Sequence, residues 1–364
     1  MNGRDASRRR FLLEAAAAAG AISIGGSLNS LSAFAASAPA AGTRKTVILG
    51  GRRLRIVDIH AHCVIPAAEK VIQGTGVAGE FPGGQVLGPN RIAEMDKRGI
   101  DIQVLSINGY WWYSANRDVA ARIVRTHDEG IAEWVKANPS RFVGLTSPSL
   151  QHPELAAEQL EYAVRTLGLR GASVGGNVRG EMISSEKYDP FWSKAEELQV
   201  PIFMHPTNAN FLVNPDTFAG RGDLGNIIGN PLETTLFLSS LIFDGTFDRF
   251  PLLKVCGAHG GGYLPSYFAR TQVTCDVRPN SRCANKRNPR EYLRSQIMAD
   301  TMVFTDEGLR HLVAEMGASQ IVYGTDIPFN WPDTLDLVIN ANFLTDAQKE
   351  AIIGGNLINL LKIA

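Results

Sequence analysis

Two histidines in the amino-terminal third of the chain, His60 and His62, have a spacing that suits metal binding. They end an apolar run with the character of a β-strand, in the stretch DIHAH at 58–62. Residues i and i+2 of a strand point to the same side, so both imidazoles can face one ion. A His-x-His pair alone is a weak signal, so the prediction depends on groups elsewhere in the chain.

Three further polar groups each follow another strand-like run. His205 ends the run IFMH, His259 ends the run VCGAH, and Asp326 ends the run VYGTD. In a parallel barrel the carboxyl ends of all strands meet at one face, where active sites are built. We therefore expect these groups to join His60 and His62 at one mouth. Imidazoles with a carboxylate suit Zn²⁺, or else Mn, Fe or Co.

The elements that must position these groups alternate in type along the chain. The expected strands cover 55–60, 102–107, 142–147, 169–174, 200–205, 254–259, a weak one within 295–305, and 320–325. Helix signals place helices at 90–98, 118–137, 153–168, 189–198, 231–243, 264–275, 307–316 and 346–363. This alternation predicts an α/β fold, a single-domain (β/α)8 TIM-type barrel over 55–364. An open doubly wound sheet is the alternative, but that fold needs a Gly-rich phosphate turn after the first strand. Here the first strand ends instead in DIHAH at 58–62.

The expected fourth strand bears on the number of metal ions. It ends in ASVGG at 172–176, without a lysine or carboxylate that could bridge two ions. The sequence therefore predicts a single divalent ion. The other histidines, His127, His152 and His311, are expected on solvated outer faces.

Seven stretches of the chain together resemble the amidohydrolase superfamily, in the branch typified by aminocarboxymuconate-semialdehyde decarboxylase. They are DIHAH at 58–62, RIAEMD at 91–96, RFVGL at 141–145, GNPLETT at 229–235, FPLLKVC at 250–256, AHGGG at 258–262 and GTDIPF at 324–329. As a set they are typical of the branch, and they are less specific for one substrate.

The resemblance implies a role for individual residues. The metal ligands would be His60, His62, His205 and Asp326, and Asp326 would also serve in catalysis. His259 matches the histidine that acts as the acid and base of the reaction.

Two arginines match residues that bind the substrate in the family. Arg91 would hold a substrate carboxylate, and Arg270 would enter the site of a neighbouring subunit. Arg270 follows His259 mostly along a helix, which places it on the order of 15 Å from the mouth. Reaching its own metal would be difficult, so a homodimer is expected.

The chain departs from the family in one aromatic feature. The decarboxylase has two tryptophans shortly before the GNPLETT stretch, where this chain has GDLGNII at 222–228. Trp111 and Trp112, after the second expected strand, either supply an aromatic substrate wall instead or pack beneath their own loop.

Residues 1–35 have the features of a twin-arginine-type export signal. SRRRFL at 7–12 precedes a weakly apolar run and an A-x-A site at 33–35, and 36–54 would form a linker or strand. The mature protein is then expected in the periplasm or outside the cell, and not in a membrane, since its apolar runs are short. In an oxidising compartment Cys275 and Cys283 either pair or stay free.

The composition narrows the class of partner. Lys and Arg together number 36, as do Asp and Glu, so the chain has no electrostatic footprint for nucleic acid or an anionic membrane. A hydrophobic share of 45% and a charged share of 20% are typical of a globular protein. The resemblance, through Arg91 and Arg270, implies a small-molecule carboxylic acid as the partner.

Three functions are compatible with these residues. The first is non-oxidative decarboxylation of an unsaturated or aromatic carboxylic acid, with the metal polarising an oxygen near the carboxylate. The second is hydrolysis of an amide, ester, lactone or C–C bond by the same groups. The arginines favour the lyase. The third, metal or solute binding without catalysis, does not explain an acid/base histidine beside a complete ligand set.

Overall fold

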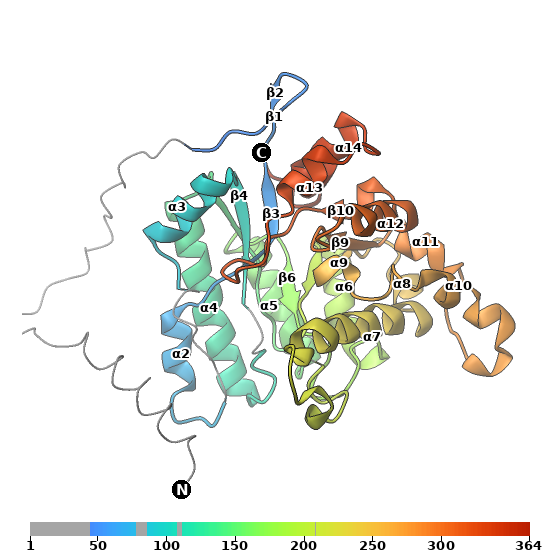
Figure 1. Ribbon diagram of the computed structural model, residues 1–364. Coiled ribbons are helices and arrows are strands. Elements are labelled where there is room, and N and C mark those ends of the chain that lie inside the picture. The colour runs from blue at the N-terminus through green and yellow to red at the C-terminus, as the bar shows by residue number, and fades with distance from the viewer. Residues whose placement is uncertain (1–43, 78–85, 108–110, 208) are drawn as a thin grey trace, which may run out of the picture. The chain divides into compact units, whose positions relative to one another are not determined.

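Eight strands alternate with helices from residue 57 onward in this computed structural model (Figure 1). The structure describes residues 44–77, 86–107, 111–207 and 209–364, so the expected export signal at 1–35 lies outside the described residues. The strands are β3 (Val57–His62), β4 (Ile102–Ser106), β5 (Phe142–Gly144), β6 (Ala172–Val174), β7 (Ile202–Met204), β8 (Val255–Gly257), β9 (Ile297–Asp300) and β10 (Ile321–Val322).

These strands form a closed parallel barrel. One sheet has the order β3-β4-β5 and the other β10-β9-β8-β7-β6. Parallel bridges join the sheets at both seams, Thr146 with Ala172 and Ala61 with Ile327. At the second seam the amide of Ile59 also donates to the Tyr323 carbonyl at 3.0 Å. The expected barrel is therefore confirmed, including its weak seventh strand.

The helices pack around the strands (Figure 1). They are α2 (Pro66–Ile72), α3 (Pro89–Arg98), α4 (Arg117–Ala137), α5 (Pro153–Arg165), α6 (Asp189–Leu198), α7 (Asn230–Phe243), α8 (Thr246–Arg249), α9 (Ala258–Gly261), α10 (Phe268–Val277), α11 (Pro289–Leu293), α12 (Asp306–Met316), α13 (Leu335–Asn340), α14 (Asp346–Glu350) and α15 (Asn356–Leu360). Side-chain caps start several of them. Asn116 accepts from Val119 at the start of α4, and Thr305 accepts from Gly308 at the start of α12.

Two helices differ from the sequence prediction. The helix expected at 264–275 begins only at Phe268. The helix expected at 346–363 is interrupted by a π-helical turn at Ala351–Gly355. This turn brings Gly354 close to the backbone just before β3, where a Cβ on residue 354 would lie 2.0 Å from the Arg55 carbonyl oxygen. The irregular turn therefore lets the last helix pack directly against the start of the barrel.

An antiparallel hairpin, β1 (Ile48–Leu49) and β2 (Arg52–Arg53), precedes the barrel. Arg44 and Arg53 each donate to the Asp101 carboxylate at 2.6 Å, and the Ile56 amide donates to the same group at 2.7 Å. These contacts tie the segment before the barrel to the amino end of β4.

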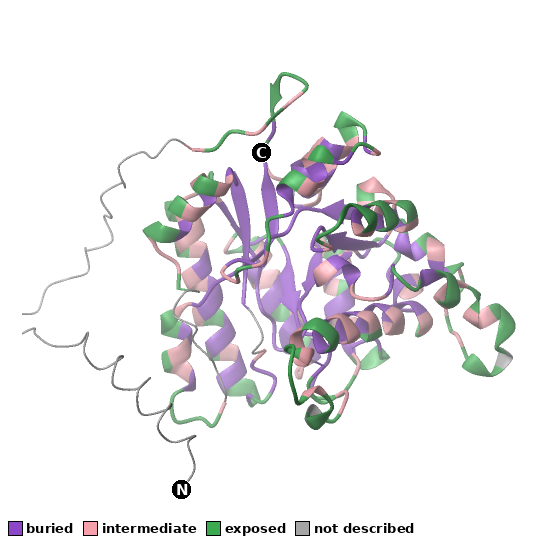
Figure 2. Cartoon of the chain, viewed as in Figure 1, coloured by how far each residue is buried: buried purple, intermediate pink, exposed green. Residues whose placement is uncertain are grey.

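The barrel strands are almost fully buried, whereas the helices expose one face (Figure 2). One apolar cluster joins strand residues to the last helix, and it includes Val57, Val104, Phe203, Val322, Leu357 and Leu361. The structure joins Cys275 and Cys283 in a disulfide. Among the described residues, none of the helices is both long and apolar enough to cross a membrane.

Candidate metal and catalytic site

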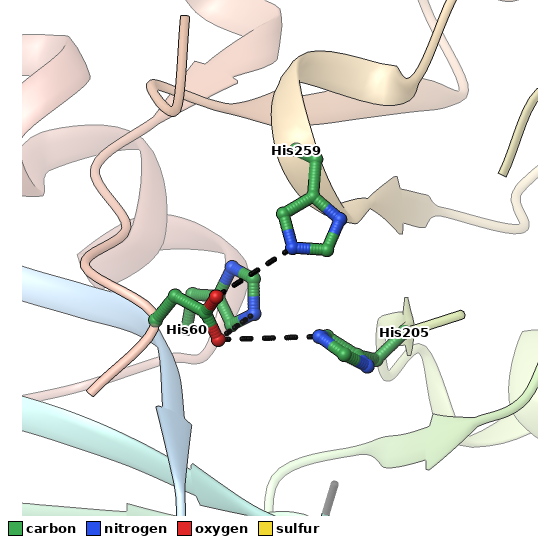
Figure 3. A group of neighbouring side chains, drawn as sticks. His60, His205 and His259 are labelled. Carbon is green, nitrogen blue, oxygen red and sulfur yellow. Dashed lines mark ion pairs between the residues drawn. The ribbon is translucent and has the colours of Figure 1, made fainter. Parts of the chain in front are cut away.

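The structure brings together the five polar groups expected at the mouth of the barrel. His60 and His62 lie at the end of β3, His205 follows β7, His259 follows β8 and Asp326 follows β10. The rings of His60, His205 and His259 point toward one another (Figure 3). Ring centroids lie 4.9 Å apart for His60 and His62, and 4.6 Å apart for His62 and His205.

The Asp326 carboxylate divides these histidines into two sets. Its Oδ1 lies 3.1 Å from His60 Nε2, 3.0 Å from His62 Nε2 and 4.0 Å from His205 Nε2. Its Oδ2 lies 3.7 Å from His259 Nε2. Three imidazoles thus face one oxygen, while His259 approaches the other. This geometry matches a set of three histidines with Asp326, and a separate histidine beside it.

The electrostatic environments of the imidazoles differ within the cluster. Burial lowers the pKa of His62 to about 4 and holds the pKa of His205 well below its usual value, so both imidazoles are neutral bases. Burial opposes the charge of His60, but the carboxylates of Asp326 and Asp300 outweigh it and raise that pKa to about 10. The same pairing holds the pKa of Asp326 well below its ordinary value despite burial.

The donor set fits a divalent ion. Within the described part of the chain, both ring nitrogens of His205 are buried without a hydrogen-bond partner, and buried His60 Nε2 has Asp326 Oδ1 at 3.1 Å. Asp326 Oδ1 lies 3.1, 3.0 and 4.0 Å from Nε2 of His60, His62 and His205. His259 also lies close, since one ligand atom from each of His60, His205, His259 and Asp326 lies within 4.8 Å of the others. Ligands about 2 Å from a common zinc ion lie roughly 3–4 Å apart, so a cation fits between these atoms.

Unusual backbone conformations aim two of these side chains. Asp326 has φ 58° and His259 has φ 56°, both in the left-handed region that non-glycine residues rarely adopt. After His259 the chain continues in that region through three glycines. A Cβ at Gly262 would lie 2.4 Å from the Pro231 carbonyl oxygen, which explains why this turn needs glycine.

Two buried aspartates that the sequence analysis missed support the cluster. Asp300, at the end of β9, accepts from His60 Nδ1 at 2.8 Å and from the His259 amide at 3.0 Å. Asp58 accepts from the His60 amide at 3.0 Å and from the Thr325 hydroxyl at 2.6 Å. The placement of Asp300 at the end of an expected strand was the one available signal.

A buried glutamate that the sequence analysis also missed, Glu233 of α7, holds the loops after β6 and β7. Its carboxylate accepts from the amides of Gly176, Thr207 and Ala209 at 3.1, 2.7 and 2.9 Å. Burial raises the pKa of Glu233 against the opposing effect of these donors. This residue belongs to the GNPLETT stretch, and its contacts explain why a carboxylate is needed there.

Arg91 of α3 lies against the end of β3. Its Nη2 donates to the His62 carbonyl oxygen at 2.5 Å, and the residue is 6% exposed. Its Nη1 is buried without a hydrogen-bond partner among the described residues. One edge of the guanidinium is therefore anchored to the strand that carries His60 and His62.

The two tryptophans differ in their surroundings. Trp111 is half-buried and lies against Gly175, where a Cβ would lie 2.4 Å from its Cδ1. Gly175 follows Val174, whose carbonyl accepts from the His205 amide at 2.9 Å, so Trp111 is near the mouth. Trp112 is 5% exposed and packs edge-on against His127.

The prediction of solvated outer positions is wrong for His127. This histidine is 1% exposed and lies 3.1 Å from the Asp128 carboxylate. It sits on the buried face of α4, where the ring of Trp112 covers it, and helix periodicity alone did not identify that face. His311 is exposed as expected, and His152 is half-buried.

Arg270 does not join the cluster within its own chain. It lies on the exposed side of α10, near exposed Tyr267, Val273 and Val277. The helical spacing of these residues places them along one side of α10.

The chain belongs to the amidohydrolase family, whose model matches residues 57–363. Two curated relatives lie in the branch expected from the sequence. The chain is 35% identical to 2-amino-3-carboxymuconate-6-semialdehyde decarboxylase of Dictyostelium discoideum, over 74% of this chain and 75% of that protein. It is 30% identical to gamma-resorcylate decarboxylase of Polaromonas sp. strain JS666, over 75% of this chain and 86% of that protein.

A solved structure supports the same relationship. A dihydroxybenzoic acid decarboxylase from Polaromonas sp. JS666, with bound manganese and the inhibitor 2-nitroresorcinol, is similar with a TM-score of 0.75 and 27% identity. The match covers 85% of this chain and 97% of that structure. The expected resemblance to this branch is thus confirmed.

Proposed function

We propose that this chain is a metal-dependent, non-oxidative decarboxylase of an unsaturated or aromatic carboxylic acid. The observation that carries the proposal is the pairing of two features at one mouth. Three histidines and Asp326 are arranged as a ligand set, and His259 lies beside them at 3.7 Å from the free carboxylate oxygen. The relatives described above, all named decarboxylases, support this reaction class over others of the family.

The residues of this chain divide the chemistry among them. His60, His62, His205 and Asp326 would hold one divalent ion, which when bound polarises a substrate oxygen near the carboxylate. Arg91 would hold a second acidic group of the substrate through its Nη1, which has no hydrogen-bond partner among the described residues. It should hold a group that stays, since gripping the departing carboxylate would stabilise the ground state.

His259 supplies the proton that completes the reaction. The C–C bond to the carboxylate breaks, its electron pair stays on the substrate carbon, and CO₂ leaves. His259 delivers a proton to that carbon and regains one from water, while Asp326 Oδ2 orients its Nε2. In the overall reaction, each carboxylate substrate takes up one proton and releases one CO₂.

The direct test is CO₂ release by the purified chain, loaded separately with zinc and manganese. 2,6-Dihydroxybenzoate and an unsaturated dicarboxylic acid serve as probes, and His259→Ala serves as the inactive control. Release of CO₂ with formation of the protonated product supports the proposal. If the enzyme instead cleaves an ester, lactone or amide and releases no CO₂ from any acid, the hydrolase reading replaces it.

The identity of the ion is part of the proposal. Three imidazoles with one carboxylate favour zinc, whereas the similar Polaromonas structure contains manganese. Metal analysis of the chain as isolated, followed by comparison of rates after reloading with zinc, manganese, iron or cobalt, tests the preference for zinc.

We further propose that the enzyme works as a homodimer in which Arg270 reaches the neighbouring site. Exposed Tyr267, Val273 and Val277 on the same side of α10 support an interface there. Mixing Arg270→Ala with His259→Ala subunits tests it, because each mixed dimer would contain one complete site. About a quarter of wild-type activity is expected after random exchange. Absence of any recovery in confirmed mixed dimers would contradict the shared site.

The amino-terminal segment leads to a proposal on location. The motif at 7–12 supports export by the twin-arginine route to the periplasm or beyond. The Cys275–Cys283 disulfide fits an oxidising compartment. Replacing Arg8 and Arg9 by Lys should retain the precursor in the cytoplasm, as followed by cell fractionation.

A further inference from the structure

Asp300 contacts both a proposed metal ligand and the backbone of the turn that carries the acid/base histidine. It is fully buried at the end of β9. Its Oδ2 accepts from His60 Nδ1 at 2.8 Å and from the His259 amide at 3.0 Å. Its Oδ1 accepts from the amides of Gly260 at 2.8 Å and Met302 at 3.2 Å.

These contacts exclude a role for Asp300 as a metal ligand. A carboxylate offers roughly four acceptor positions, and four N–H groups already occupy them. Asp326, by contrast, presents its Oδ1 to Nε2 of three imidazoles. These nitrogens would carry no hydrogen when they bind a cation, so they could not donate to Oδ1. The two aspartates at the mouth therefore have different functions.

The contact with His60 fixes which ring nitrogen carries the proton. Once a cation replaces the proton on Nε2, the His60 imidazole is neutral with one N–H, and the acceptor at Nδ1 holds that hydrogen there. Nε2, which lies 3.1 Å from Asp326 Oδ1, is then left with its lone pair directed at the cation position. Without Asp300, the Nε2–H tautomer becomes accessible, and that tautomer cannot bind a metal through Nε2.

The contacts with His259 and Gly260 support a strained turn. His259 has φ 56° and Gly260 has φ 66°, so two successive amides point toward the same side. The carboxylate receives both of them. A left-handed conformation at a non-glycine residue costs of order 1–3 kcal/mol and persists only where the surroundings hold it.

We propose that Asp300 is a positioning residue that sets the tautomer of His60 and the turn of His259 together. Metal affinity and the placement of the acid/base group are then coupled through one carboxylate. This inference rests on the proposed metal centre but holds for any substrate of that centre.

The test compares Asp300→Asn with Asp248→Asn in the full chain. Asp248 is a matched control, because its side chain is 8% exposed and accepts from the Tyr292 hydroxyl at 2.6 Å and from the Lys286 backbone amide at 2.7 Å, neither of which belongs to the proposed metal ligands. Asparagine keeps the shape of aspartate but turns an NH₂ group toward two N–H donors. Metal affinity is measured by competition with a chelator, and ligand geometry by the visible absorption of the cobalt-loaded protein.

We expect Asp300→Asn to weaken metal binding roughly 10- to 100-fold and to change the cobalt spectrum. With metal in excess, kcat for a turned-over acid should fall while KM changes little, since Asp300 does not contact the substrate. Asp248→Asn should lower thermal stability and leave metal affinity unchanged. Wild-type affinity and an unchanged cobalt spectrum in Asp300→Asn would overturn the proposal.

A second measurement needs no variant, in case Asp300→Asn does not fold. In the zinc-loaded wild-type protein with ¹⁵N-labelled histidine, His60 should carry a slowly exchanging proton on Nδ1. A proton on Nε2, or a rapidly exchanging Nδ1 proton, would overturn the proposal. Neither the chelator competition nor this spectrum requires turnover, so failure of the decarboxylase assignment would be seen separately.

Discussion

At the scale of single residues, the mouth of the barrel contains buried polar atoms that lack a hydrogen-bond partner among the described residues, and a substrate or a cation could bind to them. Arg91 is the clearest case, because its Nη2 is anchored on the His62 carbonyl while its Nη1 is buried without a partner among the described residues. Burial lowers the pKa of Arg91, but an arginine remains charged at any physiological pH. An unpaired buried cation of this kind is best explained by an anionic ligand.

Replacing Arg91 by Gln should therefore impair substrate binding more than metal binding. Loss of a charge-assisted hydrogen bond costs about 1.5–3 kcal/mol, which corresponds to a rise in KM of roughly 10- to 100-fold for an acid substrate. Steady-state kinetics with parallel metal analysis measure both effects. Arg98→Gln is the control on the same helix, since Arg98 pairs with Glu94 at 2.7 Å. An unchanged KM at full metal occupancy would exclude Arg91 from substrate binding.

The sequence identified the five mouth residues because each is a polar group at the end of an apolar run. His60, His205 and Asp326 stand out in this way. Asp300 follows a run that was only weakly strand-like, and its hydrogen bonds reach residues 240 and 41 positions away. Such a partner has no local pattern, so it emerges only when the barrel closes.

At the scale of elements, Glu233 shows how a helix outside the barrel shapes the loops at its mouth. The carboxylate reaches from α7 to Gly176 after β6, and to Thr207 and Ala209 after β7. These loops flank His205, which is one of the proposed ligands. The alternation of strands and helices predicted α7 itself. It did not predict that the buried face of α7 would carry a carboxylate that accepts hydrogen bonds from two loops.

The Glu233→Gln variant should loosen these loops. Its NH₂ group would face backbone amides that need an acceptor, and leaving a buried donor unsatisfied costs about 1–3 kcal/mol. We expect a lower unfolding temperature and faster hydrogen exchange at the amides of Gly176, Thr207 and Ala209. Exposed Glu197, which pairs with Lys194 at 2.6 Å, provides the surface control Glu197→Gln. Equal exchange rates in Glu233→Gln and wild type would argue against this role.

At the scale of the whole molecule, the proposed ligands join the two sheets of the barrel. His60 and His62 belong to the β3-β4-β5 sheet, whereas His205 and Asp326 follow strands of the other sheet. Between β3 and β10 the ladder is reduced to a single bridge, Ala61 with Ile327. A cation bound by these four residues would therefore reinforce the barrel where its backbone pairing is sparse.

Metal removal should thus lower the stability of the entire barrel and not only abolish activity. A ligand present at 100 times its Kd stabilises the folded state by about 2.7 kcal/mol. At roughly 2 °C per kcal/mol for a large domain, the melting temperature should fall by about 5 °C after chelation. It should recover in proportion to the logarithm of added metal. Calorimetry measures this shift, with hydrogen exchange at residues 59–62 and 323–327 as a local readout.

The His205→Ala variant tests whether the stabilisation by metal depends on the proposed ligands and not on a nonspecific effect of added cations. Because that variant lacks one ligand from the second sheet, its melting temperature should be lower at the outset and should respond little to added zinc or manganese. If metal instead left the melting temperature of the wild-type chain unchanged while binding with full stoichiometry, the ion would bind the folded and unfolded chains equally well and would not stabilise the barrel. The seam between β3 and β10 would then be held by its backbone pairing together with the Asp58 and Thr325 contacts.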